Sequence, residues 1–582
     1  MSALFQRLVH GFPERHAPGK NSFATDARSL RDWIAHLPLA NPGATARLLI
    51  NALRETNQLR IEPAQRLEAL EMLRPQVAQI VANLNKQVAG DSFPLPPQTQ
   101  QLGQLAQDFE LELAMGYGAA VYDFCAPAGA VPFLRARSVA LALARAVQHR
   151  GAVLYTAYLR YLAPPAGAWR NLHDLFRFAV AVRLDDKPVP DPLQEDAQTS
   201  VRLAYQHALL FALCNPYRFS QRENSETYEL TRVFAAHCEL REGRAPAGAI
   251  AVRTDSDQSP GYLPEEREAP GEGLWALEIN GLLRFLEGQL AMLPPGVEKT
   301  QFRLRGGPVV HTDVAFVERL MRGWDNAAER GEARLAAGHT LDTLIGLVDV
   351  HFALAGNQDF ETFLRKTRGT ALLSEHDRAA WPASPGATAL RVRHHVAKVL
   401  DQSLRGYRLL WEKGEGIRLK VGELVGLAPP AEDEDEPQDW MIGTIRWMRV
   451  DANGALDVGI ELLARRAIAA ALRTFDRHDA PRAPLRGILL EWLGEGPGER
   501  KGGALLTAAT FERDARQVEV TRAGDPFGWP PEPRIETVAI AAVHELGGGY
   551  VRIDLADDSA ADDAAGAVRE ETANAPRSAG LA

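Results

Sequence analysis

The amino-acid sequence predicts an α+β multidomain protein with an irregular helical N-terminal half, then an antiparallel β-barrel and a further β-rich C-terminal segment. Three observations lead to this fold class. The chain of 582 residues is several times longer than a typical domain, so it should contain more than one hydrophobic core. Apolar residues recur at spacings of three and four through roughly the first 240 residues. Beyond about residue 390 they alternate at every second position, as in strands.

Residues 1–240 are expected to form a helical domain. Asn41 and Pro42 combine a capping side chain with a proline in the first helical turn, and Leu49 and Leu53 then fall on one face. The sequence contains no repeat of fixed period, so we expect an irregular helical scaffold and not a regular solenoid. Further helices are expected near residues 63–84, 99–115, 134–162, 171–184, 200–214 and 224–238.

Changes in composition divide the rest of the chain. Residues 241–311 are rich in Gly, Pro and acidic side chains, which predicts a loop-rich connector around one helix near 279–292. Residues 312–475 are expected to hold a helix, with Thr312 as its cap, followed by a small barrel. Residues 476–556 are β-rich and should extend the barrel or pack on it. Residues 557–582 lack periodicity and are expected to be a disordered tail.

The strands of the barrel are predicted from alternation. Tyr407, Leu409 and Trp411 are apolar or aromatic at every second position. Segments 390–396 and 417–421 follow the same pattern. Segments 440–450 and 455–462 flank the turn residues 451–454, which predicts a hairpin. Several short antiparallel strands joined by tight turns favour a closed or nearly closed barrel.

Composition argues against several functional classes. The sequence has no apolar run long enough for a signal peptide or a membrane span, so a cytoplasmic protein is expected. A formal net charge of −10 disfavours extended nucleic acid as a partner. Cys125, Cys214 and Cys238 form no CxxC pair, which argues against a disulfide framework or a zinc site, and they are expected to be buried thiols. No cofactor and no metal are predicted. No nucleophile lies in a recognisable activating context, and an enzyme is not expected.

Two short motifs carry the predicted function. Arg330 and Arg334 form an RxxxR pattern before the predicted barrel. Asp401, Ser403 and Gly406 form a DxSxxG pattern at a turn between two predicted strands. With these motifs the chain resembles the PilZ family of cyclic di-GMP receptors, and segments 440–447 and 457–463 are similar to later barrel strands of that family. The resemblance covers about residues 325–475.

The resemblance implies a role for each motif residue. Arg330 and Arg334 would bind phosphates and guanine faces, because a planar guanidinium can bind guanine O6 and N7 in a bidentate manner, stack on a purine or bind phosphate. Asp401 would accept hydrogen bonds from guanine N–H groups, and Ser403 would contribute its hydroxyl. Gly406 would allow the ligand to approach the backbone closely.

The spacing of the motifs departs from the family pattern. Arg334 and Asp401 are 67 positions apart, and family members usually have a much shorter separation. An insertion at about 352–388 is therefore expected. If this insertion occupies the pocket, Arg365, Arg368 or Arg378 would be alternative cations, or binding would be absent.

The sequence thus predicts a non-catalytic receptor that binds cyclic di-GMP and relays its level to an unidentified protein partner through the helical half. The family resemblance implies a process such as motility, adhesion or pilus control. The alternative is a degenerate PilZ-domain scaffold that binds proteins but no nucleotide. In that case the motif arginines would belong to a solvated helix end, and Asp401 and Ser403 to a turn whose polar groups satisfy one another.

Overall fold

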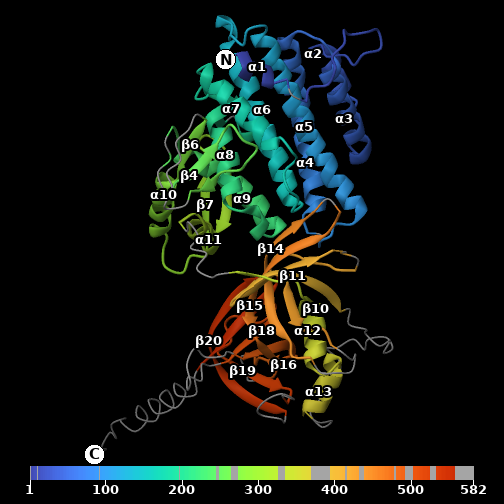
Figure 1. The fold of residues 1–582 in the computed structure, drawn as a ribbon, viewed down its shortest axis with the longest axis vertical. Coiled ribbons are helices and arrows are strands. Elements are labelled where there is room, and N and C mark those ends of the chain that lie inside the picture. Colours follow the sequence, from blue (N-terminus) through green and yellow to red (C-terminus); the bar gives the residue numbers. More distant parts are fainter. Residues whose placement is uncertain are drawn as a thin grey trace, which may run out of the picture. The chain divides into compact units, whose positions relative to one another are not determined.

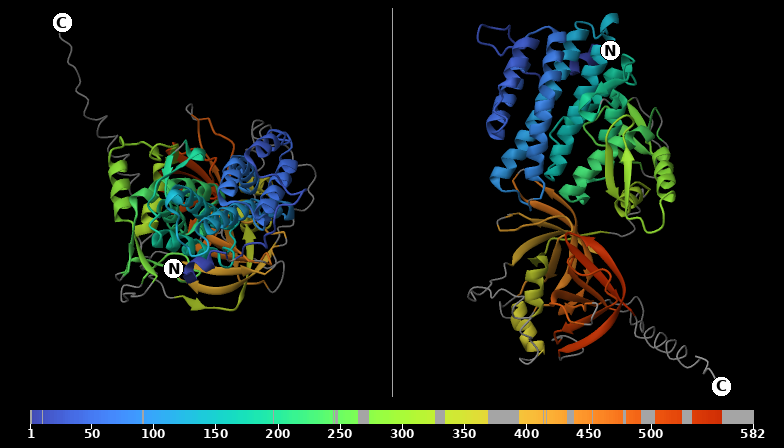
Figure 2. Two further views of the ribbon diagram at one scale, coloured as in Figure 1. Left: turned by 90° about the horizontal axis from the view of Figure 1, so that it is seen from above. Right: turned by 180° about the vertical axis from the view of Figure 1, so that it is seen from behind.

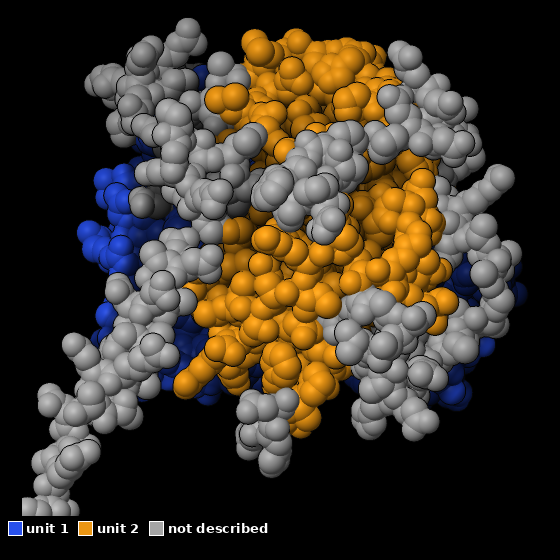
Figure 3. All heavy atoms as spheres, turned by 90° about the horizontal axis from the view of Figure 1, so that it is seen from below, with its two compact units in different colours: residues 1–91, 95–331 blue, residues 92–94, 332–582 orange. Residues whose placement is uncertain are grey.

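The computed structural model divides the chain into two compact units, which Figure 3 distinguishes by colour. Unit 1 comprises residues 1–91 and 95–331, and unit 2 comprises residues 92–94 and 332–582. Unit 1 is mainly helical and unit 2 mainly β, which confirms the predicted fold class. The structure describes all residues except 1, 10, 91, 196, 244, 246–247, 264–272, 326–333, 369–393, 413, 415, 432–437, 452, 477–479, 492–502, 525–532 and 557–582.

Seven helices of unit 1 follow segments that periodicity predicted. They are α3 (Pro42–Gln58), α4 (Pro63–Val88), α5 (Pro97–Cys125), α6 (Ala136–Leu159), α7 (Ala168–Ala181), α8 (Val201–Leu213) and α9 (Gln221–Phe234). Two shorter helices before them, α1 (Ser2–Arg7) and α2 (Ala27–Ala35), were not predicted. The long helices α4, α5 and α6 lie side by side (Figure 1). Within the described chain, no helix combines the length and the apolar character that a membrane crossing requires.

Local signals fix where these helices begin. Asn41 accepts a hydrogen bond from the N–H of Ala44, and Pro42 occupies the first turn of α3. At α9, Ser220 and Glu223 form a capping box in which each side chain accepts from the backbone N–H of the other. The predicted apolar face of α3 is buried. The helical spacing of its apolar residues, its capping and its packing therefore all favour a helix in this segment.

Segment 241–311, expected to be a loop-rich connector, contains strands as well as its predicted helix, α10 (Asn280–Ala291). These strands have only two to five residues each, so alternation is too brief to be recognised in the sequence. Thr312 was predicted to cap a helix but lies in a strand, and α11 (Val314–Asp325) begins after it. Four of these strands form one sheet, in the order β3 (Glu239–Glu242), β6 (Leu274–Glu278), β4 (Ile250–Arg253), β5 (Gly261–Tyr262). A second pair of strands consists of β7 (Lys299–Arg303) and β8 (Val309–Asp313). Earlier in the chain, β1 (Val189–Asp191) pairs with β2 (Ala197–Thr199).

The first barrel of unit 2 is a ring of six antiparallel strands. In spatial order these are β10 (Thr340–Ile345), β13 (Leu424–Ala428), β14 (Met441–Val450), β15 (Leu456–Ala464), β12 (Gly406–Trp411) and β11 (His395–Ser403). Pairing of β10 with β11 closes the ring, and the short β9 (Leu335–Ala336) continues along the same edge of β11. The predicted hairpin is confirmed as β14 and β15. Its turn is held by Asp451, which accepts hydrogen bonds from the N–H groups of Asn453 and Ala455.

The strand predicted at 417–421 is wrong. Leu419 forms only an isolated bridge with Phe93, and the next strand, β13, begins at Leu424. Gly416 and Gly422 both have positive φ, which places a turn at each end of the segment and leaves it too short for a ladder. In the predicted strand at 390–396, residues 390–393 lie outside the described residues and β11 begins at His395.

Within the expected insertion, part of the chain is helical. The described portion contains the end of α12 (Gly346–Leu354) and α13 (Phe360–Arg368), whereas residues 369–393 lie outside the described residues. Phe360 and Phe363 of α13 are buried in one apolar cluster with Ala469 and Ala471, which belong to β16 (Arg466–Arg473). The helical part of this segment is therefore integrated into the fold.

The β-rich C-terminal segment forms a second closed barrel, orange to red in Figures 1 and 2. It packs on the first barrel through a shared core in which Trp440 and Ile442 meet Ile488 and Leu506. The expected tail, 557–582, lies outside the described residues. The order in this barrel is β16 (Arg466–Arg473), β17 (Leu485–Glu491), β18 (Ala504–Ala508), β21 (Tyr550–Leu555), β20 (Arg534–Gly547), β19 (Gln517–Arg522), and β19 pairs with β16.

Candidate functional site

The motif residues meet where β9 pairs with the end of β11. Ala336 lies opposite Asp401, and this register brings Arg334, directly before β9, beside the DxSxxG turn. Nη1 of Arg334 donates to Oδ1 of Asp401 at 2.8 Å, although the two residues are 67 positions apart. The structure therefore brings the second motif arginine and the motif aspartate together. Arg330 lies outside the described residues.

The ion pair between Arg334 and Asp401 is open to solvent. The Arg334 side chain is 54% exposed and the Asp401 side chain 20%. Exposed pairs of this kind contribute about 0–1 kcal/mol to stability. Either partner can therefore exchange this contact for a ligand group at little cost.

The turn itself is shaped by strand irregularity and by one close contact. A register shift between Val399 and Asp401 interrupts the ladder of β11 with β12, just before the turn. The hydroxyl of Ser403 accepts a hydrogen bond from the N–H of Arg405 at 3.3 Å, as expected for a self-satisfied turn. At Gly406 a side chain would collide with the backbone oxygen of Ile460. Glycine is required here by the close approach of β15.

Sequence reasoning missed Arg408 and Asp457, which complete the charged cluster. Arg408 binds Asp457 in a bidentate manner, with Nε to Oδ1 at 2.9 Å and Nη2 to Oδ2 at 2.7 Å. Its Nη1 also lies 3.8 Å from Oδ2 of Asp401. Asp401 is thus flanked by two guanidinium groups, one of them fixed by a second carboxylate. Arg408 follows the motif glycine by two positions, which was the only signal available in the sequence.

Trp447 adds an aromatic surface to this cluster. The guanidinium carbons of Arg408 and Arg449 lie 5.8 and 5.9 Å from the Trp447 ring. The indole covers Gly459, where any side chain would collide with it. A half-buried indole between cations can stack on a purine base. The neighbouring carboxylates can accept hydrogen bonds from the N–H groups of that base.

The alternative cations of the expected insertion do not replace this arrangement in the described chain. Arg365 forms an ion pair at 3.4 Å with Glu361 on its own helix. The side chain of Arg368 and all of Arg378 lie outside the described residues. The described residues also contain no group of three or more side chains arranged to hold a metal ion.

Comparisons with known proteins match both halves of the chain. The family model described as "Cyclic-di-GMP receptor FimW, N-terminal domain" matches residues 28–246. The model described as "Cyclic-di-GMP receptor FimW, middle PilZ domain" matches residues 249–388 and 374–468, which include all five predicted site residues. The cyclic-di-GMP receptor FimW of Pseudomonas aeruginosa is 27% identical over 511 residues, covering 80% of this chain and 81% of that protein. No solved structure matches the chain.

The family matches confirm the PilZ resemblance and extend it to the helical half, for which the motifs indicated no family. Together they span most of the chain, and the named relative aligns along both halves. Residues 249–468 are therefore similar to the PilZ domain of a cyclic-di-GMP receptor, and residues 28–246 are similar to the N-terminal domain of the same receptor.

Proposed function

We propose that this protein binds cyclic di-GMP on the first barrel, at the turn that bears Asp401 and Ser403. The observation that carries the proposal is the position of Arg334, which the pairing of β9 with β11 places against Asp401. A cation and a carboxylate from two separate motifs are thus in contact, and Ser403 follows the carboxylate by two positions on the same strand. The relative from Pseudomonas aeruginosa, itself described as a cyclic-di-GMP receptor, supports the same ligand.

In the proposed complex, each group has a distinct partner on the dinucleotide. Arg330 and Arg334 bind phosphates and guanine edges, and Asp401 accepts hydrogen bonds from a guanine. Trp447 offers a stacking surface, while Asp457 holds Arg408 in place. A good bidentate guanine contact supplies about 1–3 kcal/mol, compared with about 8 kcal/mol for micromolar affinity. Removal of one such contact should therefore weaken binding about tenfold or more.

The proposed signal is a shift between two arrangements of the arginine segment. Cyclic di-GMP would favour the arrangement in which Arg330 and Arg334 contact the ligand, because only that arrangement supplies the phosphate contacts. A protein partner that binds the helical half would read the change, in a process such as motility, adhesion or pilus control. Capture of a partner from lysate that depends on cyclic di-GMP, and is lost in Asp401→Ala, would support the relay. Capture that does not depend on the ligand would contradict it.

Isothermal titration of the full chain tests the binding site. We expect heat of binding at tens of micromolar protein and a loss of about tenfold or more in affinity for Arg334→Ala and Asp401→Ala. Arg482→Ala is the matched control, because its exposed ion pair with Glu512 at 2.6 Å lies in the second barrel. Unchanged affinity in both site variants would contradict the assignment. Absence of heat with the native chain would favour the degenerate scaffold instead.

A further inference from the structure

Unit 1 contains a large cavity that the proposed barrel site does not use. Its volume is about 1250 Å³, above the range of roughly 300–1,000 Å³ typical of small-molecule sites. The lining comes from α4, α5, α6, α8, α9, the β1–β2 region and the turn between β7 and β8. The part of the lining that comes from α4, α6 and α8 includes four alanines, which are Ala78, Ala82, Ala152 and Ala204. The space exists because these helices present small side chains to one another.

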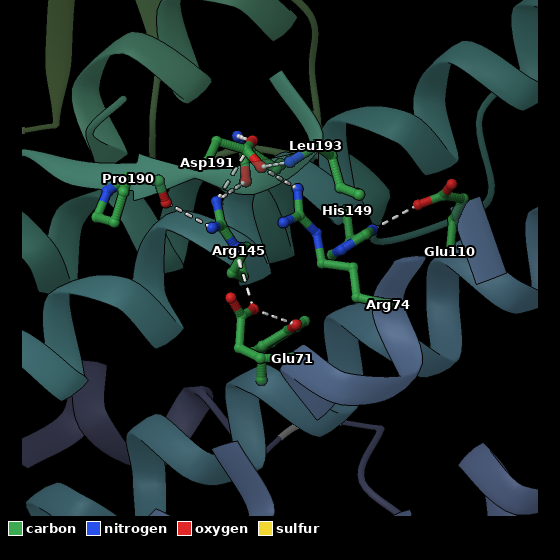
Figure 4. A network of polar contacts seen from close by, with 10 residues as sticks. Glu71, Arg74, Glu110, Arg145, His149, Pro190, Asp191 and Leu193 are labelled. Atoms are coloured by element: carbon green, nitrogen blue, oxygen red, sulfur yellow. Dashed lines mark hydrogen bonds and ion pairs between the residues drawn. The ribbon is translucent and has the colours of Figure 1, made fainter. Parts of the chain in front are cut away.

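One wall of the cavity is a network of charged groups (Figure 4). Asp191 accepts hydrogen bonds from Arg74 at 2.8 Å and from Gln148 at 3.0 Å, and it lies 3.4 Å from Arg145. Burial would raise the pKa of Asp191, but the two arginines outweigh burial and lower it. Arg145 also binds Glu71 at 3.2 Å. The wall is therefore charged and fixed in position by groups from three segments of the chain.

Two buried nitrogen atoms at this wall have no hydrogen-bond partner within the described part of the chain. Nδ1 of His149 shares a hydrogen bond of 2.6 Å with Glu110, but its Nε2 is buried and unpartnered. Nε of Arg74 is likewise buried without a partner. His149 is only 8% exposed, and a buried polar group left unsatisfied costs about 1–3 kcal/mol. Polar atoms of a ligand in the cavity would remove that cost.

The charges around the cavity are not balanced. Each lining carboxylate has a cationic or histidine partner: Glu110 pairs with His149, Asp191 with Arg74, and Glu229 with Arg232. In contrast, three exposed lining cations form no ion pair with any residue that the structure describes. These are Lys86, Arg303 and Arg305. The cavity therefore carries an uncompensated positive charge at its solvent-exposed part, which attracts anionic groups.

We propose that this cavity binds a small organic anion that carries two or more phosphate or carboxylate groups. Lys86, Arg303 and Arg305 bind the anionic groups, where charge-assisted hydrogen bonds are strongest. His149 and Arg74 bind the polar part of the ligand deeper in the cavity. The site is independent of the barrel turn, so the protein has a second ligand input within its helical unit.

Titration calorimetry on the full chain at constant ionic strength tests this proposal with defined probes. Pyrophosphate and GTP represent phosphate ligands, citrate represents carboxylate ligands, and hexaglutamate represents an acidic peptide. The combined variant Lys86→Ala, Arg303→Ala, Arg305→Ala removes the cations. The matched control Lys20→Ala, Arg31→Ala, Arg47→Ala removes the same charges from exposed positions of unit 1 outside the cavity lining.

A second variant separates shape from charge. Ala82 is an exposed lining residue, and Ala82→Trp fills part of the cavity without changing any charge. We expect at least one phosphate or carboxylate probe to bind, with a loss of about tenfold or more in the cation variant and in Ala82→Trp. The control variant and Asp401→Ala should retain the native affinity.

Three results would overturn the proposal. The first is that no phosphate or carboxylate probe binds the native chain at millimolar concentration. The second is an equal loss of affinity in the control variant, which would indicate diffuse attraction to the surface. The third is binding of hexaglutamate alone, which would identify the cavity as a groove for an acidic protein segment.

Discussion

At the residue scale, strand register assembles the candidate site. Arg334 and Asp401 could be predicted because each belongs to a short local motif. Arg408 and Asp457 meet only because β12 and β15 pair with Arg408 opposite Gly459 and Leu410 opposite Asp457. Alternation in the sequence shows which residues share a face, but it does not set the register between strands 49 positions apart. The second half of the charged cluster was therefore not predictable.

Gly406 provides a stability test at the same scale. Gly406→Ala would place a methyl group against the backbone oxygen of Ile460, which cannot move without disturbing β15. We expect a loss of about 2 kcal/mol or more, as for other overpacked sites, measured by urea denaturation. Gly338→Ala is the control in the same unit, since no atom lies within 4 Å of the added methyl group. Equal stability of the two variants would contradict the close contact.

At the element scale, helices were easier to predict than short strands. The capping signal at Asn41 identified α3, and a long run of apolar residues at helical spacing identified α4, because both signals are local in sequence. The four-stranded sheet of β3 to β6 was missed because its strands have too few residues to show a period. Conversely, the alternation at 417–421 predicted a strand that two glycine turns prevent.

Helix α12 carries a pH-sensitive contact with the second barrel. Nε2 of His351 lies 3.1 Å from the carbonyl oxygen of Ala470, and burial, aided by nearby Arg486, lowers the pKa of His351 to about 4. The unfolded chain, with a histidine pKa near 6.5, binds the proton more readily than the folded chain. Stability is therefore complete above about pH 6.5 and is lost as the pH falls toward 4. This residue should account for about 2 kcal/mol between pH 7 and pH 5.

A comparison of variants isolates the contribution of His351. His351→Gln should be less stable than the native chain at pH 7 but should lose less stability on acidification to pH 5, measured by urea denaturation at both values. His311→Gln replaces an exposed histidine and should leave the pH dependence unchanged. Equal loss of stability by His351→Gln and the native chain on acidification would contradict this role of His351.

At the scale of the whole molecule, the fold class was predictable but the closure of the barrels was not. Periodicity in the sequence distinguished the helical half from the β half. Apolar residues recur at spacings of three and four in helices and at every second position in strands. The pairing of β10 with β11 and of β16 with β19 joins residues at least 46 positions apart, and no local signal in the sequence predicts it. Residues 476–556 were thus expected to extend or pack on one barrel, whereas strands from residue 466 onward form a second ring that packs on the first.

The most direct test of the account is amide hydrogen exchange of the full chain with and without saturating cyclic di-GMP. If the ligand binds at the turn, exchange should slow in β9 and at residues 401–411, where Asp401 and Arg408 lie, and should not change in β20 and β21 of the second barrel. Protection confined to other segments, with residues 401–411 unaffected, would contradict the proposed site.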